Sequence, residues 1–569
     1  MAKIETSCTC TIKIDNKEIK HTVSSVQLKQ QLDDHHDLQV RIKQIGKTTA
    51  ERDFDDPANF TGFLGKSIAL SITPTGDILD SSLELEFIGL VTEVKLENSI
   101  DGLNTVLILA KSPTVTLDGA KQVTFFQDQS ASDIISAIVG NFPISRGNIE
   151  SSGSTIKYTV QYRETDWQYV KRLSQGAGMF AYYDGKEFIA QKANGSSSVE
   201  LTWRHSLGVF SLGLGTASSK YQSKSWEYGA KTALEGQADT SVLRSAPSDL
   251  TKVSIDASKK VFSRAEYHPT DQAADQASVD ASLAKRVESQ IGQMVRCSGE
   301  SIVPTVKVGH CVKITGMSQI DGLYWVNEVT HIFDESGKYH NEFVCSPLDI
   351  SFPSRTASRP SLTNLQSGIV TSLEDPDAKG RIKVKIPALG IETLWVRYMW
   401  PHSGNNHGWV TMPELDDEVL VGWENGNPDL PVALGSIYSG TDTLPVTPDD
   451  KNEVKVFLTR GGNEIRLTDK DGEEEIKVST KDGENSIVLS MKKPSISITS
   501  KGDVSIESTG DLSIKGKNIK IESDAATDVK AGGDLNLEAT ANMKNKAGAN
   551  LNVEASAQCV VKGAIINLN

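Results

Sequence analysis

The N-terminal part of the chain, about the first 120 residues, is built of short stretches in which apolar and polar residues alternate. Ile12 and Ile14 alternate with polar neighbours, and so do Leu38, Val40 and Ile42. Successive side chains of a strand point to opposite faces, so this period of two predicts strands with one buried face. We expect a barrel-like or meandering sheet.

Two segments change to the spacing of an amphipathic helix. In residues 130–142, Ser132 is the expected N-cap, and the apolar residues that follow gather on one face. In residues 163–178, Thr165 or Asp166 is the expected N-cap of a second helix, because apolar residues then recur three and four apart.

The strand pattern returns after the second helix. A hairpin is expected around Asp184 and Gly185. Residues 200–350 are mostly strand-like, with three consecutive strands expected between 307 and 348. A segment rich in helix-forming residues predicts one further helix near 272–290.

A polar, turn-rich stretch with two prolines predicts a domain boundary near 355–363. A compact β unit follows, up to residue 445. It contains the stretches QSGIVTSL, GRIKVKIP, TLWVRYMW, GWVTMPE, DEVLVGW and PVALGSIY. Five or six short strands of this kind suit a small Greek-key barrel.

The last part of the chain settles into a repeat of eight residues, in which pairs of apolar residues two apart recur in most octads. The phase of the pairs slips by one residue at Ile519 and then holds. A short fixed period is typical of a β-helix or solenoid. The predicted core residues of this needle are Ile496, Ile498, Val504, Ile506, Leu512, Ile514, Ile519, Ile521, Leu535, Leu537, Leu551, Val553 and Val561.

The period also predicts the number of chains. Eight extended residues span at most about 26 Å, which is too short for one chain to close a multi-sided coil around a core. Three chains that each supply one side per octad would close it. A monomer would expose a long apolar stripe, so we expect trimerisation and folding of this part to be coupled.

Composition excludes some functions. The formal net charge of −15 argues against non-specific nucleic-acid binding, which needs basic surfaces. We see no signal-peptide pattern and no run of 18 uncharged apolar residues, and therefore expect a chain made in the cytosol. The six cysteines are expected to be ordinary reduced thiols.

Candidate catalytic and metal-binding motifs are weak. His402 and His407 lack the helical spacing and the glutamate of a zinc-binding HExxH motif. His35 and His36 are adjacent, and would point to opposite faces of a strand.

The acidic segment 469–475 has its glycine at the fourth position, whereas an EF-hand loop needs it at the sixth, so we expect a β-turn at Asp471 and Gly472. We find no phosphate loop, zinc quartet or nucleophile elbow, and expect no cofactor, no metal and no catalytic residue.

ETDWQYVKRLSQGAGMFAYYDG is similar to a segment of phage-hub-like proteins. Further along, the segment from RIKVKIP to GSIYSG is similar to an OB fold, and GGNEIRLTDKDGEEEI to the entry into a needle. In this order, the three segments resemble the VgrG spike family of contractile injection systems, which is related to bacteriophage baseplate hub and needle proteins. The OB-fold motif residues are Glu418, Val419, Gly422, Gly426, Pro428, Asp429, Pro431 and Gly435.

The resemblance implies a mainly β fold in three parts. A phage-hub-like region at 1–355 would hold two barrel-like β subdomains with a few helices. An OB-fold barrel would occupy 363–445, and a triple-stranded, trimeric β-helix would occupy 446–569.

The resemblance also implies partners. A homotrimer would dock through its N-terminal ring on a hexameric, Hcp-like inner-tube protein, among baseplate proteins, and its tip would bind a PAAR-type protein. The blunt end of three β-chains leaves unpaired backbone groups that invite a cap. The expected tip-binding residues are Ile565, Ile566, Asn567, Leu568 and Asn569.

Sheath contraction would eject the spike from the bacterial cytoplasm through a target membrane, together with effector cargo. Some relatives carry a lysozyme domain before the needle or an effector after it. Because the link before the needle is short and the sequence stops after the octads, we expect an unarmed spike without catalysis of its own.

Other functions stay open. The chain could belong to an extracellular phage-tail-like injection particle rather than to a type VI secretion system, and the VgrG-like OB segment favours the latter slightly. A polysaccharide-binding tailspike is disfavoured, because residues 495–569 contain no Trp, Tyr or Phe. An enzyme within residues 200–350 would lack any recognisable motif.

Overall fold

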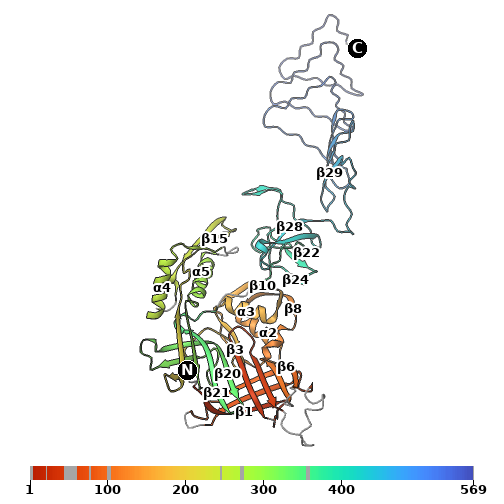
Figure 1. Ribbon diagram of the computed structural model, residues 1–569. Helices are drawn as coiled ribbons and strands as arrows, with labels where there is room; N and C mark the ends of the chain where they lie inside the picture. Colours follow the sequence, from red (N-terminus) through yellow and green to blue (C-terminus); the bar gives the residue numbers. More distant parts are fainter. Residues whose placement is uncertain are drawn as a thin grey trace. The chain divides into compact units, whose positions relative to one another are not determined.

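The computed structural model describes residues 4–20, 22–43, 61–75, 79–98, 104–243, 247–268, 275–353 and 359–567 of the chain. It divides into two compact units, Met1–Thr443 and Leu444–Asn569 (Figure 1). Strands dominate both units, so the prediction of a mainly β protein is confirmed.

The first unit contains a closed barrel. Among the described residues, the pairing runs β20-β3-β4-β7-β6-β5-β1-β21 and returns to β20. Alternate residues such as Ile12 and Val40 are buried inside, as their spacing predicts. The strands are β1 (Thr6–Ile14), β3 (Val23–Gln31), β4 (Asp37–Lys43), β5 (Ser67–Pro74), β6 (Leu85–Asn98), β7 (Asn104–Lys111), β20 (Gly322–Asp334) and β21 (Lys338–Pro347).

A second ring shares β20 and β21 with the first. β19 (Cys311–Thr315) and β13 (Ser198–Thr202) extend the sheet beyond β20, while β18 (Val295–Ser301) and β14 (Leu207–Leu214) extend it beyond β21. A bridge between Trp203 and Leu207 joins the two outer strands. The three consecutive strands predicted between 307 and 348 are β19, β20 and β21.

Two helices lie beside the second ring. The predicted helix near 272–290 is α5 (Gln276–Ile291), which buries Val279, Leu283 and Val287 against the sheet β16-β15-β17 (Thr232–Ala238, Tyr221–Glu227, Glu266–Tyr267) and the second ring.

The other helix, α4 (Asp249–Val261), is not among the predicted helices. Its buried face consists of Ile255 with Thr251, Ser254 and Ser258, whereas Val253 and Val261 are exposed. The core-facing side of this helix is therefore mainly hydroxyl-bearing.

An insertion between β7 and β13 carries the two helices predicted near its sequence motifs (Figure 1). α2 (Ala131–Val139) begins two residues earlier than expected, because the N-cap is Ser130 and not Ser132: the Ser130 hydroxyl accepts from the Asp133 amide. α3 (Asp166–Gly176) is capped by Thr165 in a capping box with Gln168. The insertion also contains η2 (Pro113–Asp118), β8 (Lys121–Ser130), β9 (Arg146–Ile149), β10 (Thr155–Thr165), β11 (Phe180–Tyr183) and β12 (Phe188–Gln191).

The hairpin predicted around Asp184 and Gly185 is confirmed, because β11 and β12 pair across that turn and Gly185 has φ +110°. The predicted Greek-key unit contains a sheet in the order β24-β23-β22-β27-β28. These strands are β22 (Gln366–Ser372), β23 (Lys383–Ile386), β24 (Ile391–Glu392), β27 (Glu418–Trp423) and β28 (Pro431–Ser436).

Two predicted strands of this unit are wrong. TLWVRYMW makes only the isolated bridges Ile382–Val396 and Tyr398–Ala433. Of GWVTMPE only Gly408 lies in a strand, the two-residue β26 (His407–Gly408), and Trp409 and Val410 are exposed. Apolar alternation gives a strand only where a partner strand is available for the backbone groups.

Candidate functional site

The second unit begins with five short antiparallel strands in sequence order. Gly462, Gly472 and Gly483, in the turns between them, have φ of +90°, +70° and +71°, which glycine adopts without steric cost. At the second turn the Glu473 amide donates to the Lys470 carbonyl (2.8 Å), so the acidic segment forms the predicted β-turn. The strands are β29 (Val454–Leu458), β30 (Glu464–Thr468), β31 (Glu475–Ser479), β32 (Ser486–Ser490) and β33 (Ser495–Thr499).

One face of this sheet is apolar and uncovered in the single chain. Leu467 pairs with Ile476, which also pairs with Leu489 on the next strand. These three side chains are 40–45% exposed, and Ile496, which continues the row on β33, is 73% exposed. A contiguous apolar face of this kind marks an interaction surface.

Beyond β33 the chain continues as extended legs joined by bends (Figure 1). The bends recur every eight residues, except that seven residues separate the bend at 517–518 from the bend at 524–525. Ile519 and Ile521 stand on this short leg. The phase slip in the apolar pattern is therefore a leg that is one residue shorter than the others.

The legs have no partner within the single chain. Among the described residues, no strand and no hydrogen bond between main-chain groups occurs after residue 500. The thirteen predicted needle-core side chains are each 54–78% exposed. The single chain thus has the period of the repeat but not the ladder of a β-helix, and the trimeric β-helix stays a prediction.

The predicted tip lies partly within the described residues. Ile565 is 82% exposed and Ile566 is 49% exposed, and Asn567 ends the described chain. Leu568 and Asn569 lie outside the described residues. Binding of a tip partner by these five residues stays a prediction.

The OB-fold motif residues shape the backbone of the first unit. Gly426 has φ +67°, and a Cβ there would lie 2.0 Å from the Ser361 hydroxyl. Gly435 lies where the register of β27 and β28 shifts. Glu418 and Pro431 begin these two strands.

Three further motif residues have packing or turn positions. Gly422 lies in β27, where a Cβ would press on Leu365 and Leu434. Pro428 stands in the turn before Asp429. This turn aims the Asp429 carboxylate away from its own sheet.

Asp429 joins the OB-fold strands to β10 of the hub region. Its carboxylate accepts two hydrogen bonds from the Arg359 guanidinium, one of them 2.8 Å long, and one from the Val160 amide (2.6 Å). Arg359 also donates to the Val160 carbonyl (3.3 Å) and to Asn427 Oδ1 (2.5 Å). Both charged side chains are about one-fifth exposed. A two-pronged pair of this kind is both strong and geometrically specific.

We call the Arg359–Asp429 pair, together with its hydrogen bonds to Val160, the staple. Apolar residues surround it. Tyr158, Val160 and Tyr162 of β10 pack with Leu394 and Trp423 of the OB-fold region. The sequence motif identified Asp429 but missed Arg359, which lies 70 positions earlier. The only sequence signal for Arg359 is that it is an arginine in the linker before the OB fold.

The four histidines singled out in the sequence are not brought together in one site. His36 is buried against Phe87 and Tyr183, and burial lowers its pKa to about 3. The His35 ring instead contacts Asp118 (2.8 Å). His402 and His407 are exposed in a small hairpin. Within the described ranges, no cluster of three or more His, Cys, Asp or Glu side chains could hold a metal.

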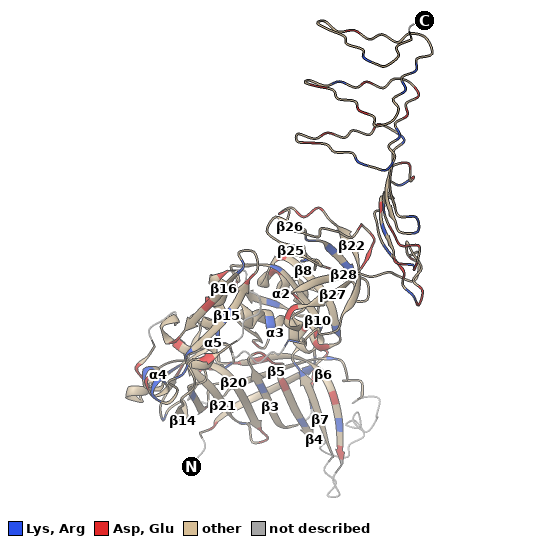
Figure 2. Cartoon of the chain, turned by 90° about the horizontal axis from the view of Figure 1, so that it is seen from above, with Lys and Arg blue, Asp and Glu red and all other residues tan. Residues whose placement is uncertain are grey.

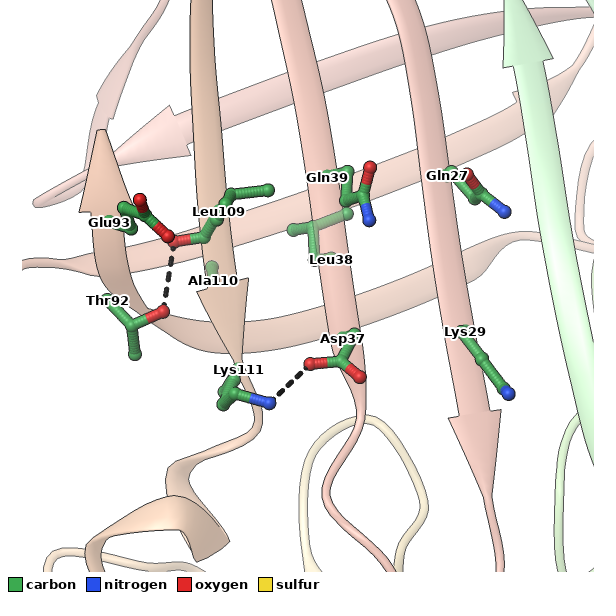
Figure 3. Close-up of a pocket in the computed structure, with 10 residues that line it drawn as sticks. All are labelled: Gln27, Lys29, Asp37, Leu38, Gln39, Thr92, Glu93, Leu109, Ala110 and Lys111. Carbon is green, nitrogen blue, oxygen red and sulfur yellow. Dashed lines mark hydrogen bonds and ion pairs between the residues drawn. The ribbon is translucent and has the colours of Figure 1, made fainter. Parts of the chain in front are cut away.

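A depression of about 360 Å³ lies on the outer side of β3, β4, β6 and β7 (Figure 3). Its charged groups are paired: Lys111 with Asp37 (2.6 Å), and Lys29 with Glu328 (3.3 Å). The lining contains no Ser, Cys or His side chain, which are the usual nucleophiles and general base of acyl-transfer and hydrolytic sites. We assign no chemistry to it.

The cysteines are free thiols in this structure. Burial raises the pKa of Cys8 to about 11 and that of Cys10 to about 12, so both stay protonated near neutral pH. Cys297 stands directly opposite Cys345 across β18 and β21, a proximity that the sequence does not reveal. In the part of the chain that the structure describes, no helix is long and apolar enough to span a membrane.

Comparisons with known proteins agree with this architecture. The family model described as phage tail baseplate hub (GPD) matches residues 38–337. A second, described as the type VI secretion system/phage-baseplate injector OB domain, matches residues 366–438.

The related curated proteins include spike proteins of Pseudomonas aeruginosa. Type VI secretion system spike protein VgrG5 is 26% identical over 32% of this chain and 28% of its own length. VgrG1a is 21% identical over 60% of this chain and 59% of its own length. The chain thus aligns with less than two-thirds of either relative.

A solved structure, the half-lidded Francisella PdpA-VgrG complex, has a similar fold. It matches with a TM-score of 0.57 at 9% identity, over 87% of this chain and 88% of the matched one.

Proposed function

This chain belongs to the phage tail baseplate hub (GPD) family as a VgrG-type spike protein, and from that premise we propose that three copies form the spike of a contractile injection machine. The spike docks on a hexameric inner tube and punctures a target membrane when the machine contracts. Its contribution is a rigid, pointed assembly that carries effectors.

The observation that carries this proposal is the uncovered apolar surface of residues 454–567. Its needle-core side chains are 54–78% exposed in one chain, and burying one such Val, Leu or Ile contributes about 1.5–3 kcal/mol. The legs also leave their backbone groups without main-chain partners. Two further copies would bury the exposed side chains against facing apolar pairs. They would also supply neighbouring strands to pair with the free backbone groups.

The base supports docking on a sixfold tube. Each chain contains two β rings that share β20 and β21. Three chains therefore present six rings, which suits a hexameric, Hcp-like inner-tube protein. Baseplate proteins hold this ring in place before contraction.

The far end of the needle takes a separate tip. The apolar side chains of Ile565 and Ile566 are exposed there, and the ends of three β-chains need a cap. A PAAR-type protein is the proposed occupant, with effector cargo travelling on the spike. The spike is made in the bacterial cytoplasm and leaves it only by ejection.

The spike works without catalysis of its own. This proposal is supported by the paired charges of the depression on the barrel and by the separate environments of His35 and His36. The alternative assignment, to an extracellular phage-tail-like particle, uses the same trimer. A polysaccharide-binding tailspike is less suited, because residues 495–569 lack aromatic side chains on which sugars stack.

The solution mass of the purified chain tests the proposal. Light scattering coupled to gel filtration should give the mass of three chains of 61.6 kDa each. A chain truncated before residue 454 is the matched control, because it keeps the base and lacks the needle. A stable monomer of the full chain would refute the trimer and return the octads to a single-chain solenoid.

A further inference from the structure

The octads carry a charge pattern that the apolar core does not require. The residue directly after the second inward position of each octad is glutamate in one octad and lysine in the next, without exception over eight octads. Figure 2 shows acidic and basic residues interspersed along this part of the chain. We call this set the charge ladder; it consists of Glu507, Lys515, Glu522, Lys530, Glu538, Lys546, Glu554 and Lys562.

The alternation is confined to this position. The residue between the two inward positions, also outward-facing by strand periodicity, shows no such order: it is Ser505 and Ser513 in two octads, then Lys520 and Asp528. A general demand for solubility would therefore not produce the ladder. The ladder keeps its place relative to the apolar pairs even across the short leg at Ile519.

The ladder residues are mostly without partners in one chain. Glu522 pairs with Lys520 of its own leg (2.5 Å). Within the described octads, none of the other seven forms an ion pair, and all are exposed. Their charges are available to another molecule.

In a trimer that molecule is a second copy of this chain, an inference that rests on the proposed function. In three copies wound about one axis, with each octad forming one side, threefold symmetry places octad n of one copy beside octad n+1 of the next. Neighbouring strands run parallel at about 4.8 Å. Each inner glutamate of the ladder then lies between lysines of the other two copies, and each inner lysine between glutamates. Glu507 and Lys562, at the two ends, each have one such neighbour.

We propose that the charge ladder sets the register between the three copies of the needle. Six of the eight ladder octads carry two apolar inward residues, and the other two replace one of them with Thr527 or Asn545. A slip of one copy by one octad would still set apolar residues against one another in most layers. The same slip would stack glutamate on glutamate and lysine on lysine, and like charges directly opposite are destabilising. The ladder thus acts against the misregistered assembly rather than only for the correct one.

The short leg complements the ladder. A slip by two octads would restore the alternation of charge. It would, however, set the seven-residue leg around Ile519 against a leg of full length. The two features together leave one register in which apolar pairs, charges and leg lengths all agree.

Two full-length variants of equal composition and net charge test the proposal. The blocked variant K515E/K530E/E538K/E554K gives four consecutive glutamates and then four lysines. The inverted variant exchanges glutamate and lysine at all eight positions and keeps the alternation. Both are compared with the native chain by light scattering during a temperature ramp, in about 0.1 M and about 1 M NaCl, where the Debye lengths are about 10 Å and about 3 Å.

We expect the inverted variant to stay trimeric like the native chain. The blocked variant should lose more than half of its trimer at low salt and regain it at high salt. A blocked variant as stable as the native trimer would overturn the proposal. Loss of the trimer in both variants would also overturn it, because alternation would then be insufficient. A native chain that is itself monomeric would instead refute the proposed function.

Discussion

The staple between Asp429 and Arg359 gives a sharp test of how the OB-fold region is held on the hub. Substituting Asp429→Asn keeps the shape of the side chain but removes the charge and turns one acceptor into a donor. In the native chain Oδ1 accepts from the Val160 amide and from Arg359 Nη2, while Oδ2 accepts from Arg359 Nη1. The amide keeps an acceptor at only one of these two positions and sets an N–H against the donor at the other. One of those donors is therefore left unpaired.

The magnitude follows from the exposure of the pair. Removing one partner of a fully buried pair costs about 3–5 kcal/mol, and an exposed pair contributes about 0–1 kcal/mol. Arg359 and Asp429 are 20% and 22% exposed, so we expect a loss of about 2–3 kcal/mol, between these limits. In local opening, this corresponds to exchange about 30-fold to 150-fold faster.

Hydrogen exchange followed by mass spectrometry measures the rate of local opening at the Val160 amide, which donates to Asp429. The matched control is Lys157→Met on the same strand, since the pair of Lys157 with Asp128 is largely exposed. We expect this control to change exchange less than about fivefold. If D429N and K157M exchange at equal rates, the staple does not hold the two regions together. The same conclusion would follow if the effects of Arg359→Met and D429N were additive in a double-mutant cycle.

Three further predictions concern the needle and the barrel. The Cys559 thiol is exposed in one chain but stands at an inward position of its octad, so alkylation at pH 7 should be at least tenfold slower in the trimer than after dissociation; equal rates would contradict an inward Cys559. Ile506→Asp should convert the trimer to monomers by light scattering, because it buries three carboxylates together, whereas Ser505→Asp, outward on the same leg, should not; a trimeric I506D would contradict the core assignment. Burial lowers the pKa of His36 and His331 to about 3, so unfolding takes up protons below pH 6.5 and the barrel loses stability as pH falls from 6.5 towards 3. Burial raises the pKa of Asp33 to about 6, which acts in the opposite direction between pH 6 and 3.8. Burial also lowers the pKa of His310 to about 4. Three histidines against Asp33 give a net loss of unfolding free energy of about 2.7 kcal/mol per pH unit between pH 6 and 4, and His36→Phe should about halve this slope in denaturant unfolding; an unchanged slope would contradict the assignment.

Local features of this chain could be predicted because they depend on residues close in sequence. The capping box at Thr165, the hairpin at Gly185 and the β-turn at Gly472 each follow from a few neighbouring residues. The octad period and its slip at Ile519 are also periodic features of the sequence alone. Within the candidate site, the sequence therefore determined which needle residues are apolar and how they recur.

The tertiary structure decided the long-range pairings. The barrel closes because β20 pairs with β3 and β21 pairs with β1, which brings Phe333 beside Val26 and Tyr339 beside Thr6. No local periodicity encodes a contact across some 300 residues, because its energy comes from a shared core and is opposed by the entropy of closing the intervening loop.

The staple and the polar-faced helix α4 have the same explanation. Arg359 and Asp429 are recognisable as a pair only once β10 packs against the OB-fold region and both side chains bind the main chain of Val160. The buried face of α4 includes Thr251 and Ser258, residues that ordinarily indicate surface, and only their tertiary neighbours place them inside. The sequence by itself thus determined the elements that repeat or turn locally, while the folded structure determined which distant elements share a core, because that choice depends on partners the local pattern does not contain.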